Sequence, residues 1–146
     1  MARARLTYSA GNEHNPSDPF GRSLLAIEPD GAARLDHFAR FTEPRAWTGR
    51  VAPDALDRLW AALGRAGFPA VPSHPVTAGA TIRALAVEAD GERQTAHVEW
   101  YAAEDLPGYD EAFALLDALI RQLTAGEVWP TAPALPAMVG EVRRVS

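Results

Sequence analysis

The most restrictive feature of the sequence is a pair of alternating runs joined by an Asp-Gly dipeptide. Ile82 to Ala89 and Gln94 to Tyr101 each alternate in polarity, which is the period of a strand with one buried face. Asp90-Gly91 lies between them, and hairpin turns favour this dipeptide because both positions accept a positive φ. The two runs predict an antiparallel β-hairpin, although the flanking residues leave the length of its loop open.

Alternating runs also occur in the first third of the chain, where turn-forming residues separate them. The runs are Arg3 to Tyr8, Phe20 to Glu28, Ala33 to Phe41 and Arg45 to Val51. A polar stretch from Gly11 to Pro19 follows the first run, and Pro29-Asp30-Gly31 follows the second. We expect a meander of antiparallel strands, with the polar stretch as an exposed loop.

Two later segments have helical rather than strand periodicity. From Pro53, apolar side chains recur at i, i+3, i+4 and i+7, and Gly67 supplies a stop signal. A second stripe runs from about Tyr109 to Leu123. The fold class predicted is α+β: an antiparallel sheet made of a meander plus a hairpin, packed by two helices.

The last part of the chain is rich in proline. Pro130, Pro133 and Pro136 rule out a long helix there, while apolar residues including Trp129 argue against a disordered tail, which is the alternative. We expect an extended proline-rich C-terminal strap that packs Trp129 against the body. The predicted organisation is a single α+β domain over residues 1–124 and an extension over residues 125–146.

Composition limits the chemistry available to the chain. At 146 residues, with 47% hydrophobic and 23% charged residues, it can bury the core of one domain. The absence of cysteine excludes disulfides, thiolate zinc sites and cysteine nucleophiles. All 14 basic residues are arginine, which excludes lysine Schiff bases and a phosphate-loop lysine.

Charge and hydropathy indicate the kind of partner. A net charge of −5 argues against nucleic-acid binding, which needs a concentrated basic face. No apolar run approaches the roughly 20 residues of a membrane helix, and no signal-peptide pattern follows the basic start. We therefore expect a cytoplasmic protein that binds neither nucleic acid nor membrane.

The histidines offer the best starting point for an enzymatic or metal-binding hypothesis. His97 and Glu99 stand two residues apart on one strand, so both side chains point to the same face. Any strand offers such pairs, and no second histidine pair with ligand spacing accompanies them. We predict no metal and no cofactor, and keep as an alternative a small-ligand or enzymatic pocket between sheet and helices lined by His37, His97 and Glu99.

Carboxylates and aromatic residues gather before the second helix. Glu104-Asp105 and Asp110-Glu111 fit helix capping or solvation, a patch for a basic partner, or general acid/base work. Trp100 and Tyr101 are adjacent on a strand, so at least one of them points away from the core. That side chain is covered either by a loop or the tail, or by a partner.

The order of strands, helix, hairpin and leucine-rich helix resembles the emfourin-like family of small bacterial proteins. The resemblance covers roughly residues 4 to 124. It rests on Leu6-Thr7-Tyr8-Ser9, Leu56 to Pro72, Ala84 to Gly91 and Leu115 to Ile120. It implies a proteinaceous inhibitor of thermolysin-type zinc metalloproteases, and hence a protein partner and no catalytic residues.

Exposed loops between rigid elements are where binding residues usually lie. We therefore predict a non-catalytic protein-binding domain, with an immunity, regulatory or structural module of an operon-encoded system as an alternative. Dimerisation through an exposed sheet edge would be the sign of a structural module. The candidate partner-binding residues are Asn12, Glu13, His14, Asn15, Glu104, Asp105 and Tyr109.

Overall fold

The computed structural model describes residues 4–11, 21–39, 42–72, 81–100, 102–129 and 131–145. Its strands are β1 (Arg5–Gly11), β2 (Arg22–Ile27), β3 (Ala32–Phe38), β4 (Arg45–Val51), β5 (Ile82–Ala89), β6 (Glu92–Glu99) and β7 (Val139–Arg144). The helices are α1 (Pro53–Ala66), the 3₁₀ helix η1 (Ala102–Asp105) and α2 (Tyr109–Leu123). The α+β prediction, with an antiparallel sheet and two helices, is confirmed.

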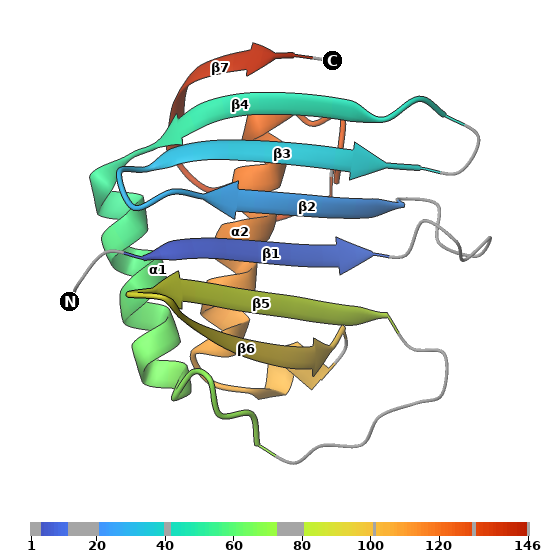
Figure 1. The fold of residues 1–146 in the computed structure, drawn as a ribbon. Helices are drawn as coiled ribbons and strands as arrows, with labels where there is room; N and C mark the ends of the chain where they lie inside the picture. The colour runs from blue at the N-terminus through green and yellow to red at the C-terminus, as the bar shows by residue number, and fades with distance from the viewer. Residues whose placement is uncertain are drawn as a thin grey trace.

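The strands form one antiparallel sheet in the order β6-β5-β1-β2-β3-β4-β7. The meander β1 to β4 pairs in sequence order, and the hairpin β5–β6 joins it through β1 (Figure 1). Ala89 pairs with Glu92, so Asp90-Gly91 is a two-residue loop with φ values of 53° and 78°. Positive φ at both positions is the geometry of a type I′ turn, which settles the loop length that the sequence left open.

The helices begin and end where the sequence indicates. Pro53 lies in the first turn of α1, and Gly67 ends the helix in the left-handed region with φ 79°. The N–H groups of Gly67 and Phe68 donate to the carbonyls of Gly64 and Leu63, which closes the last turn as a glycine C-cap. Leu56, Leu59 and Leu63 are buried, as their helical spacing predicts.

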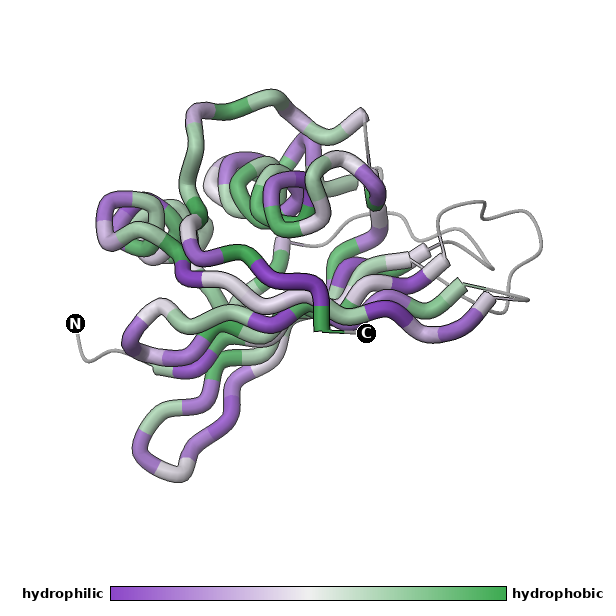
Figure 2. The backbone as a smooth tube through the Cα atoms, turned by 90° about the horizontal axis from the view of Figure 1, so that it is seen from above, coloured by the Kyte–Doolittle hydropathy of each residue, from purple (hydrophilic) through white to green (hydrophobic). Residues whose placement is uncertain are grey.

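Both helices cover the same face of the sheet. Figure 2 shows α1, α2 and the segment after α2 on one side, while the β5–β6 hairpin bends away to the other side. The core lies between the layers, and its largest fully buried side chains include Tyr8, Leu25, Leu35, Leu85 and Leu116. The opposite face has no helix over it in the described part of the chain.

The proline-rich segment runs along α2 and then joins the sheet. Gln122 of α2 donates to the carbonyls of Leu135 and Pro136 and accepts from the N–H of Met138 at 2.7 Å. After these contacts the chain continues into β7, which pairs with β4. The extension therefore contributes a strand to the same sheet, which the prolines did not indicate.

Candidate interaction surface

We call the sheet face opposite the helices the open face. Residues directly opposed in neighbouring strands share a face, so the register identifies its side chains. One row across the open face consists of His97, Ala84, Ser9, Leu24, Asp36 and Ala46. A second consists of Thr95, Ala86, Thr7, Ala26, Arg34 and Thr48.

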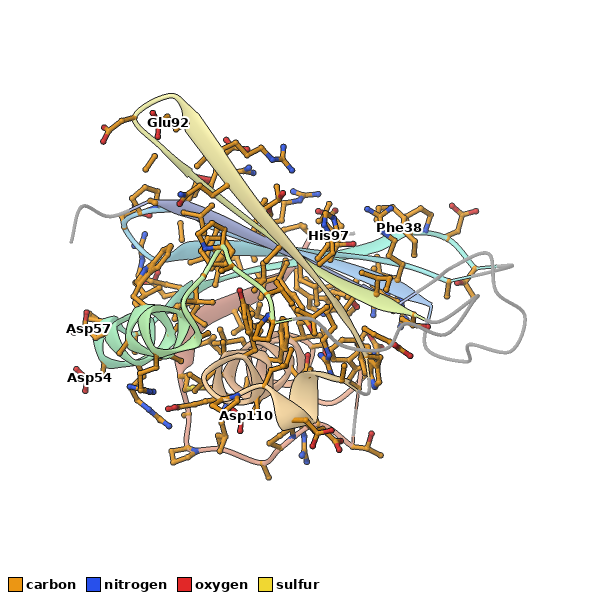
Figure 3. The ribbon with its side chains drawn as sticks, turned by 90° about the horizontal axis from the view of Figure 1, so that it is seen from below. Phe38, Asp54, Asp57, Glu92, His97 and Asp110 are labelled. Atoms are coloured by element: carbon orange, nitrogen blue, oxygen red, sulfur yellow. The ribbon has the colours of Figure 1, made fainter. Side chains whose placement is uncertain are left out.

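Small side chains occupy the centre of the open face. From β5 to β2 the two rows contain Ala84, Ala86, Ser9 and Thr7, followed by Leu24 and Ala26. Half-buried apolar side chains flank this centre, among them Phe38 at the end of β3 and Ile82 at the start of β5. Figure 3 shows Phe38 and His97 on the side of the sheet away from the helices. The open face is therefore mixed: small and half-buried apolar side chains lie beside polar and charged ones, among them the ion-paired Arg34 and Asp36.

A charged hollow of about 410 Å³ lies at one end of the open face. The hairpin turn and the β2–β3 turn flank it, and its lining includes Glu92, which Figure 3 shows at the hairpin turn. Arg5 pairs with Glu28 at 2.6 Å, and Arg93 pairs with Glu88 at 3.6 Å. All four side chains are well exposed, so these ion pairs contribute little to stability.

The predicted pocket of His37, His97 and Glu99 does not form. His37 faces the helices, is 3% exposed, and its Nδ1 lies 2.9 Å from the hydroxyl of Ser23. His97 and Glu99 project to the open face, where His97 is exposed and Glu99 is buried. The sheet separates His37 from the other two, because strand alternation sends an inward-facing and an outward-facing side chain to opposite sides.

The predicted partner-binding residues differ in their exposure. Glu104 and Asp105 are exposed on η1, as a binding role requires. Tyr109 is fully buried, and its hydroxyl donates to the carbonyl of Ala70 at 2.7 Å. The prediction that Tyr109 contacts a partner is therefore wrong, because the side chain starts the buried stripe of α2. The predicted residues 12–15 lie outside the described residues.

The sequence analysis missed a buried polar cluster between the sheet and α2. Arg83 of β5 and Asp117 of α2 form an ion pair at 3.0 Å, and each residue is 8% exposed. The hydroxyl of Tyr8 donates to Asp117 at 2.8 Å and also contacts the guanidinium of Arg83. Two features of the sequence could have indicated this cluster. Arg83 lies at an inward-facing position of its strand, and Asp117 interrupts the apolar stripe of the last helix.

Burial shifts the acid–base properties of this cluster. Desolvation raises the pKa of Asp117 above its ordinary value of 3.8, and the guanidinium of Arg83 and the hydroxyl of Tyr8 oppose that rise. Desolvation, reinforced by the charge of Asp117, raises the pKa of Tyr8 well above 10.0. Tyr8 is therefore a neutral phenol that donates to the carboxylate, which is a structural use of both groups.

Two tryptophans cover the cluster. The Trp100 ring stacks on the guanidinium of Arg83, with the Arg83 Cζ atom 3.6 Å from the ring centroid. Trp129, which follows α2, packs edge-on against Trp100 with 5.3 Å between centroids. Trp129 is 6% exposed. Trp100 therefore packs on the helix side of the sheet against the tail, and the other candidate for the outward position, residue 101, lies outside the described residues.

Among the described residues, no group of three or more His, Asp or Glu side chains is arranged to hold a metal ion. Neither α1, α2 nor η1, the helices of the described part, is long and apolar enough to cross a membrane. No model of a known protein family matches the sequence, and no curated protein is significantly similar to it.

Proposed function

We propose that this chain is a non-catalytic protein-binding domain that presents the open face of its sheet to a partner. The observation that carries the proposal is the distribution of side chains over the two faces. One face is packed by both helices, whereas the other carries small, half-buried apolar and polar side chains, and none of the described helices lies over them. Arg34, Asp36 and His97 stand on the same face, and a mixture of apolar and polar side chains is the usual composition of a non-obligate protein interface.

The placement of the buried reactive side chains also supports binding over catalysis. His37 is buried against Ser23, and the carboxylate of Asp117 is bonded to Tyr8 and Arg83 beneath Trp100. A general acid or base must reach a substrate proton directly or through one water. Groups enclosed in this way stabilise the fold and have no access to a substrate.

The partner class follows from the emfourin-like resemblance, which implies inhibition of a thermolysin-type metalloprotease. The test is a titration of thermolysin and related proteases with the purified protein, with peptide hydrolysis as the readout. We expect a loss of activity that saturates at one inhibitor per enzyme. Binding without inhibition would favour the immunity or regulatory role, and no binding to any such protease would contradict the inhibitor function.

The role of the open face can be tested with a matched pair of variants. Ala84→Arg places a long charged side chain among the small side chains of the open face, whereas Asp57→Arg introduces the same side chain on the exposed surface of α1 (Figure 3). We expect Ala84→Arg to weaken partner binding by tenfold or more, about 1.4 kcal/mol, and Asp57→Arg to leave it unchanged. Equal affinities for both variants would place the binding surface elsewhere.

A further inference from the structure

Strand β7 lies at the end of the sheet beside β4 (Figure 1), and it is the one strand of the described residues that has no buried residue. Five of its six residues are exposed, whereas three of the seven residues of β1 are buried. Val142 is 42% exposed, and Val145, which follows the strand, is 49% exposed. Arg144 pairs with Glu127 at 3.4 Å, but both side chains are about half exposed, so the pair contributes little. Elements with so little burial are the first to open locally.

The backbone of β7 departs from a regular strand at Glu141. Its φ is 54°, in the left-handed region where a side chain crowds the backbone. The register with β4 shifts there, so that Glu141 and Val142 together oppose the single residue Gly49. Glu141 also pairs with Arg50 at 3.4 Å, and the exposed fractions of their side chains, 77% and 49%, make this pair weak as well. The strand therefore carries strain at its centre, and few side-chain contacts offset it.

The chain immediately before β7 is firmly held. The N–H of Met138 donates to Gln122 at 2.7 Å, and the Met138 carbonyl accepts from the N–H of Ala52 at 2.8 Å. Met138 is 4% exposed. Gly140, two residues later, has nothing within 4 Å of a Cβ built on it, and glycine has more backbone freedom than any other residue. The strand can therefore swing away at Gly140 while the segment before it stays in place.

We propose that β7 is a detachable strand and that the edge of β4 beside it binds an extended segment of a protein partner. When β7 leaves, the N–H and C=O groups of β4 with which it pairs become available to another strand. Addition of a strand to such an edge is a common mode of peptide recognition, in which main-chain hydrogen bonds supply affinity and alternate side chains supply specificity. The edge of β4 is distinct from the open face, so failure of this proposal would leave the proposed function standing.

The side chains around Gly49 indicate which segment fits this edge. A Cβ built on Gly49 would lie 2.7 Å from Cδ2 of Leu123 and 3.5 Å from Cγ2 of Val142, so both side chains meet at this glycine. An aromatic side chain in place of the partly exposed valine would cover Gly49 and Leu123 more completely, as aromatic residues do beside glycines in sheets. On the other face, Arg50 pairs with a carboxylate, which Glu141 now supplies. The segment that fits has an acidic residue opposite Arg50 and, next to it in sequence, an aromatic residue opposite Gly49.

The probe is a synthetic peptide based on residues 139–145 of this chain. A single glutamate replaces Gly140 and Glu141, which removes the bulge and places a carboxylate opposite Arg50. Val142→Tyr supplies the aromatic side chain. The peptide is thus a regular strand with the chemistry that the β4 edge favours.

A control peptide differs from the probe only by Arg143→Pro. The N–H of Val145 donates to the carbonyl of Ala46 at 2.9 Å, and hydrogen-bonded pairs alternate with non-bonded ones along the ladder. The N–H of residue 143, which opposes Thr48, therefore also points to β4. Proline removes this donor, so the control separates strand addition from nonspecific adsorption.

The first measurement is amide hydrogen exchange of the full chain, followed by NMR. Detachment opens Arg143 and Val145 together, so both amides should be about tenfold or more less protected than the amides of β1. Fraying of the chain end alone would leave Arg143 protected as β1 is. Glu141→Asn and Glu141→Gln both remove the charge, but asparagine adopts a positive φ more readily. Glu141→Asn should therefore raise the protection of both amides about threefold or more above that in Glu141→Gln.

The second measurement is titration of the isotope-labelled full chain with each peptide up to roughly 1 mM, the scale on which a tethered strand competes. We expect saturable binding of the probe with shifts at β4, and binding about tenfold or more weaker for the control peptide. Because the probe binds only the open form, Glu141→Asn should weaken its binding, relative to Glu141→Gln, by the factor by which it raises protection. Four outcomes overturn the proposal: protection of Arg143 equal to that of β1, no binding of the probe, equal binding of probe and control, or equal affinity of the probe for Glu141→Asn and Glu141→Gln.

Discussion

The ion pair between Arg83 and Asp117 joins the middle of the sheet to α2 inside the core. Removing two charges from water costs several kcal/mol per ion, and a buried pair recovers this only with good geometry and further hydrogen bonds. Part of this compensation is present, because Tyr8 donates to Asp117 and Trp100 stacks on the guanidinium, whereas Nε of Arg83 is buried without a hydrogen-bond partner among the described residues. Removing one partner would leave the other charge buried alone, so the cluster specifies how α2 is positioned on β5 and β1.

The raised pKa of Asp117 predicts a pH-dependent stability. The folded state binds the proton of this carboxyl more tightly than the unfolded chain does. The resulting contribution is fully present below the unfolded pKa, near 3.8, and is lost as pH rises through the folded pKa. Asp117→Asn removes the titration, so the wild-type minus variant difference in the free energy of unfolding should fall across that window and then level off.

Urea unfolding of both proteins from about pH 3 to about pH 7 measures this difference, and the subtraction cancels the other carboxyl groups. Asp117→Asn keeps a neutral side chain of nearly the same shape, so the two proteins are expected to differ least at the acid end of this range. A difference that rises with pH over the acid range would mean that the charged carboxylate is the form favoured by folding.

Residue-scale features were the hardest to predict from sequence. Burial of Tyr109 follows from its place on the stripe of α2, but its position beside Glu104 and Asp105 suggested a loop residue. The separation of His37 from His97 follows from strand phase, yet it depends on which alternating set faces the helices. Alternation within one strand shows which of its residues share a face. Which side of the sheet those residues take relative to residues of a distant strand is decided by how the strands pair.

At the scale of elements, glycines determine how closely the two helices approach. Gly108, with a φ of 87°, precedes α2, and a Cβ built there would lie 2.3 Å from the backbone N of Ala66 at the end of α1. Gly64 is exposed within α1 and has nothing within 4 Å of such a Cβ. The same substitution should therefore have opposite effects at these two positions.

We expect Gly64→Ala to raise the free energy of unfolding by about 0.5–1 kcal/mol, because alanine loses less backbone entropy in a helix. Gly108→Ala should lower it by at least about 2 kcal/mol, through backbone strain and separation of α1 from α2. Thermal unfolding followed by circular dichroism measures both. A tolerated Gly108→Ala would show that the α1–α2 contact is looser than described.

The elements themselves were well predicted, because each carries its own period and stop signal. The type I′ turn at Asp90-Gly91 and the cap at Gly67 needed only local sequence. Strand β7 was missed for a physical reason: five of its six residues are exposed and it lacks a buried alternation. Its formation depends on β4 and on Gln122, which lie far away in the sequence.

At the scale of the whole molecule, the extension is part of the folded body. Val128, Trp129 and Met138 are buried, and burial of one such side chain contributes about 1.5–3 kcal/mol. Three of them together approach the total stability of a typical domain, about 5–15 kcal/mol. A chain that ends after Thr124 should therefore melt roughly 10 °C or more below the full chain.

A second truncation, after Met138, separates the two contributions. It keeps the three buried side chains and removes β7 alone, so its melting temperature should lie between those of the shorter chain and the full chain. Differential scanning calorimetry of the three proteins gives the comparison. Equal melting temperatures for the full chain and the chain ending after Thr124 would mean that residues 1–124 fold independently of the extension.

The position of β1 in the middle of the sheet affects the order in which the protein can assemble on the ribosome. Its neighbour β2 is synthesised almost at once, whereas β5, the neighbour on its other side, follows more than seventy residues later. Until α1, the hairpin and α2 have emerged, a nascent β1–β4 meander leaves one edge of β1 unpaired and its apolar face uncovered. Such an intermediate is a substrate for chaperones, and slow synthesis between β4 and α2 prolongs its exposure to aggregation.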